Sequence, residues 1–427
     1  MEVCMDREKI SNSSEKKRGP LASFGKNFSP ARFFVLLMAL SFTVYLIFYM
    51  VRGQAGFVDI FFLRTKDLFM DFFNSVRDAS QGAEVYTVRH VIYPPMANLI
   101  YLICSRFLPT AFNQSGWYER LTWRQYPEAI FFITVFTLIL TVILYTLIHE
   151  SVKGSKTKKF LFAFFAVFSV PILHMLERGN MILFCLIALF VYAFTYNSEN
   201  KIHREIGLLC LAFAFSLKLY PVIFGWMLLT DKRYKDGIRC ALYGLLMLIL
   251  PSIPFGGFSC FVQIFKNITS FSGGSTTAIS VISAYSGIPA PAIKIAAYIW
   301  CFICVACFIL APFIHKEKRW KMWMLGVLVI ITVPSLSSLY VWAFLLIPMI
   351  MIENSEKRNA SDWFFFVIMS LLFAFTLLRF NSYLTLNTFL MFPFIAILSI
   401  TAVADTVICG VRRLRSARAA KSMSKEN

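Results

Sequence analysis

Charged residues are scarce in this sequence. Only 15% of the 427 residues are charged, whereas a soluble globular chain carries roughly a quarter. Hydrophobic residues make up 58% of the chain, and Phe alone occurs 46 times. A water-soluble core could not hide that much apolar surface. The shortage of charge therefore excludes an ordinary soluble protein and indicates an integral membrane protein that crosses the bilayer many times.

Acidic residues are the scarcer of the two kinds of charge. The chain has 23 Asp and Glu against 42 Lys and Arg, which gives a net charge of +19. In a soluble protein this excess would suggest nucleic acid as a partner. Here the basic residues lie between apolar runs and at both chain ends, and no basic stretch is interleaved with aromatic residues outside those runs. We therefore expect membrane lipids, with no nucleic acid, beside these basic segments.

Paired cysteines and metal-binding motifs are also missing. Cys301, Cys304 and Cys307 recur every three residues, but they lie in an apolar run with no His beside them. They are expected to pack inside a helix. The first apolar run starts near Phe33 and is long enough to span, which predicts an anchor rather than a cleaved signal peptide. No metal site and no cofactor are predicted.

The apolar runs predict an all-α polytopic membrane protein with about 11–13 transmembrane or half-spanning helices. The runs cover Phe33–Val51, Val91–Leu108, Ala129–Ile148, Phe160–Met175, Met181–Tyr196, Ile206–Leu229, Ile238–Phe255, Ala292–Ile314, Met322–Ile352, Trp363–Leu378 and Leu384–Ala404. Residues 1–32 are expected to form a disordered basic tail and residues 409–427 a second basic tail. Residues 33–408 form the membrane domain, with long outer loops at 52–90 and 256–290.

The placement of basic residues predicts the orientation. The cytoplasmic segments would be the N-terminus, 153–159, 231–239, 315–321, 353–358 and the C-terminus, and the outer ones 52–90, 177–180, 256–290 and 379–383. This holds only if the runs in 91–127, 206–229 and 322–352 enter and leave on the same side. Each of them contains a proline or polar interruption. Broken helices are tolerated at membrane depth where they line a cavity, so a cavity opening on the outer side is expected.

The first outer loop contains an amphipathic pattern. Polar residues fall at helical spacing on one stripe, which consists of Asp67, Asp71, Asn74, Ser75 and Asp78. An apolar stripe beside it consists of Phe69, Phe72, Phe73 and Val76. This pattern predicts a helix in the membrane interface. The carboxylates either face water or include one that lies over the cavity as a general base.

Two cations interrupt the apolar runs. Arg178 lies in the short segment Glu177-Arg178-Gly179-Asn180, which is either a simple tight turn or a turn that presents a cation to a phosphate. Lys218 is the only charge in 24 residues and precedes Leu219-Tyr220-Pro221. It either reaches the interface as a snorkelling side chain or binds an anion at the outer apex of the run.

A third motif, Tyr93-Pro94-Pro95, opens an apolar run, and proline in the first turn of a helix explains it on structural grounds alone. Arg89 and His90 precede it directly and are candidates for the same site.

The order of these motifs resembles glycosyltransferase family 87, the polyprenyl-phosphate-sugar-dependent membrane enzymes of the GT-C superfamily. The resemblance rests on Asp71-Phe72-Phe73-Asn74-Ser75, Tyr93-Pro94-Pro95, Arg178-Gly179-Asn180, Ser216-Leu217-Lys218-Leu219-Tyr220-Pro221 and Asp231-Lys232-Arg233. It covers roughly residues 30–260. Beyond them only the general pattern of spans is similar.

The resemblance implies a GT-C-like arrangement and an inverting hexosyltransferase in the plasma membrane, with both termini cytoplasmic. It would move a hexose, for which mannose is one candidate, from a polyprenyl phosphate to a glycan or lipid acceptor on the outer face. Asp71 best matches the catalytic aspartate, with Asp59, Asp67 and Asp78 as alternatives. The substrate-binding residues would be Arg89, His90, Tyr93, Arg178, Asn180, Lys218 and Tyr220.

Two other functions stay open at this point. Broken helices and buried ions also suit a transporter or lipid flippase, although no internal repeat relates the two halves of the chain. A membrane scaffold without activity is the third hypothesis, and it leaves Lys218 unexplained.

Overall fold

The protein is all-helical wherever its structure is described. The computed structural model describes residues 28–53, 68–110, 122–270, 283, 286–332, 339–374 and 386–426. Five helices in these ranges are long and apolar enough to cross a membrane, namely Pro30–Val51, Pro127–Ser151, Tyr234–Phe255, Ala290–Ile314 and Pro393–Ala419. Shorter apolar helices lie between them. The prediction of an all-α polytopic membrane protein is confirmed.

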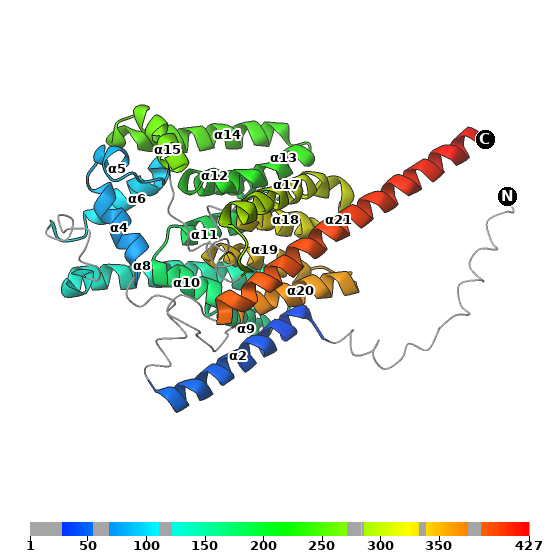
Figure 1. Cartoon of the computed structure of the whole chain (residues 1–427), viewed down its shortest axis with the longest axis horizontal. Coiled ribbons are helices and arrows are strands. Elements are labelled where there is room, and N and C mark those ends of the chain that lie inside the picture. The colour runs from blue at the N-terminus through cyan, green and yellow to red at the C-terminus, as the bar shows by residue number, and fades with distance from the viewer. Residues whose placement is uncertain are drawn as a thin grey trace.

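The helices form one bundle with two distinct ends (Figure 1). In chain order they are α2 (Pro30–Arg52), α4 (Met70–Ala79), α5 (Glu84–Thr87), α6 (Pro95–Ser105), η2 (Thr122–Gln125), α8 (Pro127–Ser151), α9 (Lys156–Val167), α10 (Val170–Arg178), α11 (Ile182–Thr195), α12 (Lys201–Leu217), η3 (Tyr220–Gly225), α13 (Trp226–Thr230), α14 (Tyr234–Ile249), η4 (Leu250–Phe255), α15 (Ser259–Ser270), α17 (Ala290–Ile314), α18 (Arg319–Thr332), η5 (Leu339–Leu345), α19 (Leu346–Glu353), α20 (Ala360–Phe373) and α21 (Leu386–Glu426). Helices α4, α5, α6 and α15 gather at one end, which we call the α4 end. The C-terminal part of α21 projects from the opposite side, which we call the basic end.

One predicted span is bent in the structure. The run Phe160–Met175 was expected to be a single helix, but α9 and α10 meet at an angle of 50°. The cause is Pro171, which lacks a backbone N–H and whose ring would clash with the carbonyl four residues earlier in a continuous helix. Ser169 has an extended backbone and begins the second helix. Because of the bend, α10 ends inside the bundle at Arg178.

The interruption expected at Lys218 is present. Helix α12 ends at Leu217, and Lys218 has an extended backbone with φ −145° and ψ 133°. The chain then continues as the short η3 segment, in which Pro221 is tolerated near the start. The other interruption, at Pro334–Ser338, lies outside the described residues, with α18 and η5 on either side of it.

The second outer loop contains a helix that the sequence reasoning missed. Residues 256–290 were expected to be a loop, yet α15 forms within them. The Ser, Gly and Thr residues that suggested a loop follow α15, whereas Cys260, Ile264 and Asn267 recur at helical spacing and are buried. The final helix α21 also continues through position 409, where the predicted basic tail begins.

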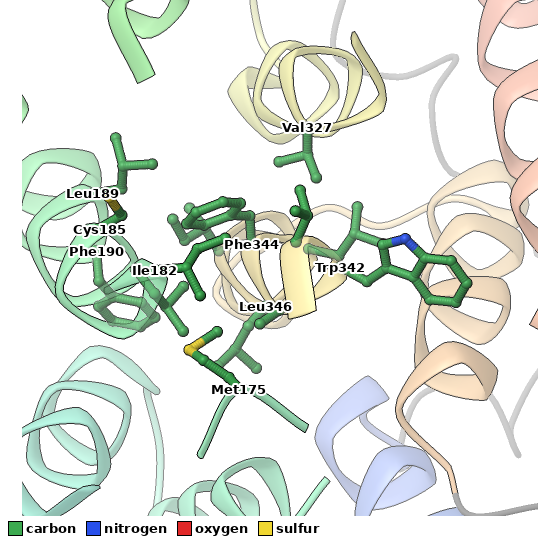
Figure 2. Packing of buried hydrophobic residues seen from close by; sticks show 14 of the residues in the cluster. Met175, Ile182, Cys185, Leu189, Phe190, Val327, Trp342, Phe344 and Leu346 are labelled. Carbon is green, nitrogen blue, oxygen red and sulfur yellow. The ribbon is translucent and has the colours of Figure 1, made fainter. Parts of the chain in front are cut away.

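The core lies between α10, α11, α18, η5 and α19. Figure 2 shows Ile182 of α11 beside Phe344 of η5, with Met175 of α10 below and Val327 of α18 above. All four side chains are fully buried. Gly326 allows this packing, because a Cβ at its position would lie 2.6 Å from the Phe224 ring. Phe224 of η3 is thus enclosed by protein, whereas Leu219 and Val222 of the same broken segment are exposed.

Ion pairs, some of them buried, join the predicted cytoplasmic segments at the basic end. Glu353 is 4% exposed, and its carboxylate accepts hydrogen bonds from Ala31 N at 2.8 Å and Lys158 Nζ at 2.6 Å. Lys318 binds Asp362, and Arg319 lies 3.4 Å from Asp231. Segments that the charge pattern placed on one side of the membrane thus lie together at one end of the bundle.

Glu353→Gln tests this connection. The variant keeps the size of the side chain but removes the charge that compensates Lys158, so we expect a loss of about 2 kcal/mol in the free energy of unfolding. Thermal unfolding in detergent micelles measures the effect. Glu356→Gln, three residues on and exposed, is the matched control and should melt with the wild type. Equal melting temperatures for all three proteins would contradict the role of Glu353.

Candidate functional site

Side chains from four parts of the chain meet at the α4 end. Oδ1 of Asp71 accepts a hydrogen bond from the Arg178 guanidinium, and Oδ2 accepts one from Asn180 Nδ2 at 2.8 Å. Asn180 Nδ2 also lies 3.2 Å from the Tyr93 hydroxyl. The Lys218 ammonium group lies over the Tyr93 ring, with Nζ 3.9 Å from the ring centroid. Most of the residues that the sequence singled out are therefore in one cluster.

The turn between α10 and α11 positions the side chains of Arg178 and Asn180. Gly179 takes the left-handed conformation, with φ +61°, that ends α10. Its N–H bonds the Leu176 carbonyl at 3.0 Å, and the N–H of Asn180 bonds the Met175 carbonyl at 3.4 Å. Asn180 Oδ1 then accepts the Ile182 N–H at 3.1 Å, which caps the start of α11. Asn180 thus both caps a helix and donates to Asp71.

Close packing between the turn and α4 brings the turn to Asp71. A Cβ on Gly179 would lie 2.8 Å from Phe72 Cβ, so only glycine permits this approach. The Phe69 N–H bonds the Glu177 carbonyl at 2.6 Å and ties the start of α4 to the end of α10. Asp71 follows in the first turn of α4, where the helix dipole favours a negative charge. The side chains of Asp71 and Arg178 keep 20% and 16% exposure, so a ligand can reach the pair.

The cluster carries an excess of positive charge. Arg178 is paired with Asp71. Within the part of the chain that the structure describes, no carboxylate lies within ion-pair distance of Lys218 Nζ, which rests on the Tyr93 ring instead. The neighbouring Glu177 carboxylate has its own partner in His174, at 3.1 Å. Among the described residues, Lys218 is thus the cation of the cluster without a carboxylate partner, which makes it a candidate for binding an anion.

Arg89 and His90 do not join Asp71. Arg89 Nε lies 3.8 Å from Asp78 Oδ1, two helical turns further along α4, where Arg77 Nε lies 3.9 Å from the same oxygen. Burial raises the pKa of the Asp78 carboxyl, and the two guanidinium groups oppose that shift. His90 is exposed and has φ +52°, which turns the chain away before Tyr93. Since Asp78 is enclosed by two arginines, it suits a structural role better than that of a base.

The other predicted positions are Tyr220, Asp59 and Asp67. Tyr220 lies two residues after Lys218, and its ring meets Phe344 edge-on at 6.1 Å. Its hydroxyl is buried and meets no hydrogen-bond partner among the described residues. Asp59 and Asp67, the alternatives to Asp71, lie outside the described residues.

The sequence reasoning missed a layer of polar residues behind the cluster. His174 and Glu177 are buried beside Arg178, and the His174 ring stacks on Tyr340 at 5.8 Å. Asn98 is fully buried, and its Nδ2 donates to the Tyr86 hydroxyl at 2.8 Å. His174 and Asn98 both lie inside apolar runs, and that isolation was the signal available in the sequence.

An apolar recess adjoins the cluster. It lies between α8, α10 and α11 and reaches the Gly179–Asn180 turn. Its walls consist of Phe72, Phe136, Thr137, Leu140, Met175, Leu176, Met181, Leu183 and Phe184. On the outer surface of α8, apolar side chains such as Phe131 and Leu138 are exposed, as expected for a helix that faces lipid. Apolar side chains thus border the polar cluster on the side of α8, α10 and α11.

A group of potential metal ligands lies far from this cluster, at the basic end. The ligand atoms of His315, Asp405 and Cys409 lie within 4.8 Å of one another. Lys321 Nζ is 2.5 Å from Asp405 Oδ2 and already compensates the carboxylate. A cation would have to displace this ammonium group, so the group does not favour a metal.

The pattern of glycosyltransferase family 87 matches residues 92–338, more than half of the chain. The chain belongs to glycosyltransferase family 87. The resemblance predicted from the motifs is confirmed, and the protein is a membrane glycosyltransferase rather than a transporter or a scaffold. No curated protein and no solved structure gives a significant match. Tyr93, Arg178, Asn180, Lys218 and Tyr220 of the glycosyltransferase lie within the matched range, whereas Asp71, Arg89 and His90 precede it.

Gly179→Ala should disrupt the cluster. An alanine at this position is strained by the positive φ, and its Cβ would also clash with the Phe72 side chain. We therefore expect the free energy of unfolding to fall by about 3 kcal/mol. Gly257 has φ +64° with nothing within 4 Å of an added Cβ. Gly257→Ala therefore introduces backbone strain without a steric clash, and its free energy of unfolding should fall by about 1 kcal/mol. Thermal unfolding of both variants gives the difference. Equal losses would show that the contact with Phe72 is unimportant.

Proposed function

We propose that this glycosyltransferase transfers a hexose, with mannose as the first sugar to test, from a polyprenyl-phosphate donor to a glycan or lipid acceptor at the α4 end. The observation that carries the proposal is the single cluster that combines the Asp71 carboxylate with Arg178, Asn180 and Lys218. A carboxylate suits a general base, and cations suit a phosphate leaving group.

The proposed reaction is a single displacement with inversion. The acceptor hydroxyl oxygen attacks the anomeric carbon, Asp71 takes the hydroxyl proton, and the bond between that carbon and the phosphate oxygen breaks. The sugar passes through an oxocarbenium-like state. The electron pair of the broken bond stays on the polyprenyl phosphate, which leaves with one more negative charge than it had as a phosphodiester.

Charge balance supports this division of roles. A polyprenyl-phosphate sugar is a phosphodiester with one negative charge, and the cluster has one cation without a carboxylate partner among the described residues. The second charge that develops on the phosphate would draw on Arg178, whose bond to Asp71 weakens when that carboxylate takes the acceptor proton. The same proton transfer thus releases the guanidinium for the leaving group.

Asn180 and Tyr93 would position the reacting groups. Asn180 donates to the oxygen of Asp71 that Arg178 does not bind, which leaves further lone pairs on both oxygens for the acceptor hydroxyl. Tyr93 provides the aromatic face under Lys218 and accepts from Asn180. Arg89, His90 and Tyr220 lie further from Asp71 and would contact more remote parts of a substrate.

The surroundings of the cluster favour a lipid-linked donor. The apolar side chains beside Asn180, which include Leu176 and Phe184, favour an apolar group near the cluster. The basic end would face the cytoplasm, because Lys and Arg are enriched there. The α4 end would then open on the outer face of the plasma membrane, where nucleotide sugars are absent and an activated sugar arrives on a lipid. We infer no requirement for a metal, since a single phosphate is already matched by the two cations.

Asp71→Asn is the decisive variant for the base. It keeps the size of the side chain but cannot accept the proton, so the rate should fall at least about 100-fold. The assay follows the release of polyprenyl phosphate from labelled polyprenyl-phosphate mannose by purified protein, with alkyl glycosides as acceptors. Glu84→Gln, in the neighbouring exposed turn, should retain full activity. Asp78→Asn should lower the melting temperature more than the rate. A wild-type rate for Asp71→Asn would refute the assignment.

Lys218→Met tests the phosphate site. The variant keeps an unbranched side chain over the Tyr93 ring and removes the charge, so the KM for the donor should rise by about 10- to 100-fold. The matched control is Lys235→Met, an exposed lysine at the basic end, which should leave the KM within about twofold. An unchanged donor KM for Lys218→Met would show that Lys218 does not contact the phosphate.

A further inference from the structure

Helix α15 leaves a stripe of large apolar side chains uncovered. Phe258, Val262 and Phe265 follow one another at helical spacing and are 75%, 57% and 70% exposed. Residues at this spacing lie on one face of a helix. Ile268 extends the same side of the helix and is also exposed. In water such a stripe would be unfavourable, so it needs an apolar partner.

The stripe continues the lipid-facing surface of the preceding span. On α14 the exposed side chains include Leu242, Leu246 and Ile249, and this span belongs to the helices that are apolar enough to cross the membrane. Ile253 of η4 and Phe258, directly before α15, are exposed as well. Exposed apolar side chains thus recur from α14 through η4 to α15, which favours a position of α15 against the same bilayer.

The opposite face of α15 holds the chain segment that leads to Tyr93. Asn267 is 3% exposed, and its Nδ2 donates to the carbonyls of Tyr86 at 2.9 Å and Val91 at 3.0 Å. Gln263 Nε2 in turn donates to Asn267 Oδ1 at 3.0 Å, which fixes the orientation of the amide. A small apolar cluster supports these bonds, with Cys260 and Ile264 packed against Val85 and Phe255.

A second set of hydrogen bonds connects Tyr86 to Tyr93. The Tyr86 hydroxyl donates to the Tyr93 carbonyl at 3.0 Å. Asn98 Nδ2 donates to the Tyr86 hydroxyl and reaches the Tyr93 carbonyl at 3.4 Å. Since the Tyr93 ring carries Lys218, a shift of the 86–93 segment would move the ammonium group away from the phosphate that it is proposed to bind.

We propose that α15 is an interfacial helix whose apolar stripe, Phe258, Val262 and Phe265, enters the lipid leaflet at the α4 end, while Asn267 on its other face acts as a positioning residue for the 86–93 segment. The bilayer then serves as the outer support of the site. The role of Asn267 rests on the proposed function, whereas the seating of α15 in lipid does not.

Photolabelling tests the lipid contact without any need for activity. The full-length protein is reconstituted in phosphatidylcholine vesicles that contain a phosphatidylcholine with a diazirine in its acyl chain, irradiated, and mapped by mass spectrometry. Residues 258–265 should be labelled to an extent within about threefold of residues 242–249 on α14, which form the internal reference. Labelling of α14 with none at 258–265 would overturn the proposal, whatever the enzyme's activity.

Kinetics test the positioning role. Asn267→Ala should raise the KM for polyprenyl-phosphate mannose about 10-fold, with kcat within about threefold of the wild type, because a displaced Lys218 weakens binding. Lys266→Ala, the exposed neighbour, is the control and should change neither parameter. A merely structural role would reduce the active fraction and lower kcat at an unchanged KM, and that result would overturn the assignment.

A third variant covers the case in which Asn267→Ala does not fold. Gln263→Ala removes only the amide that orients Asn267, so it should raise the donor KM in the same direction by about threefold. An unchanged KM for this variant would count against Asn267. If no donor is turned over by the wild-type protein, the proposed function fails, and the labelling result still decides whether α15 lies in lipid.

Discussion

The attachment of the α10–α11 turn to Asp71 is the constraint on which the site depends. The hydrogen bonds from Arg178 and Asn180 to the two carboxylate oxygens join positions more than 100 residues apart in the chain. They form only because Gly179 lets the turn approach Phe72 and because the Phe69 N–H bonds the Glu177 carbonyl. Helix α10 must therefore end at this depth, and the bend before Pro171 makes it short enough to do so.

The same geometry explains why helices are broken in a protein that spans a membrane. A continuous helix keeps its backbone groups bonded and its polar side chains away from the interior. The break after Leu217 instead places Lys218 over Tyr93, and the end of α10 places Arg178 beside Asp71. Each break exposes backbone and charge at the α4 end. Between the two ends the core is closed by apolar residues such as Trp323 and Phe344.

Hydropathy and charge predicted the class of fold, the order of the spans and the interruption at Lys218, because these follow from transfer energies of single residues. Asp71, Arg178 and Lys218 stood out as charges near apolar runs. Two features depend on the three-dimensional arrangement of the chain and could not be predicted: the turn at His90 that separates Arg89 from Asp71, and the docking of α15 through Asn267. Pro171 marks the bend in the sequence, but a hydropathy value averaged over many residues does not register a single proline.

The two ends of the bundle differ in how charge is balanced, and the difference indicates where a ligand belongs. At the basic end the buried carboxylates of Glu353 and Asp362 each hold a lysine ammonium group within 2.6 Å. At the α4 end, within the described ranges, Lys218 has only an aromatic face. A cation at membrane depth is costly unless an anion compensates it. Within the described ranges the fold thus pairs these carboxylates with lysines at one end and leaves Lys218 without a carboxylate at the other, which is in keeping with the proposed polyprenyl-phosphate donor.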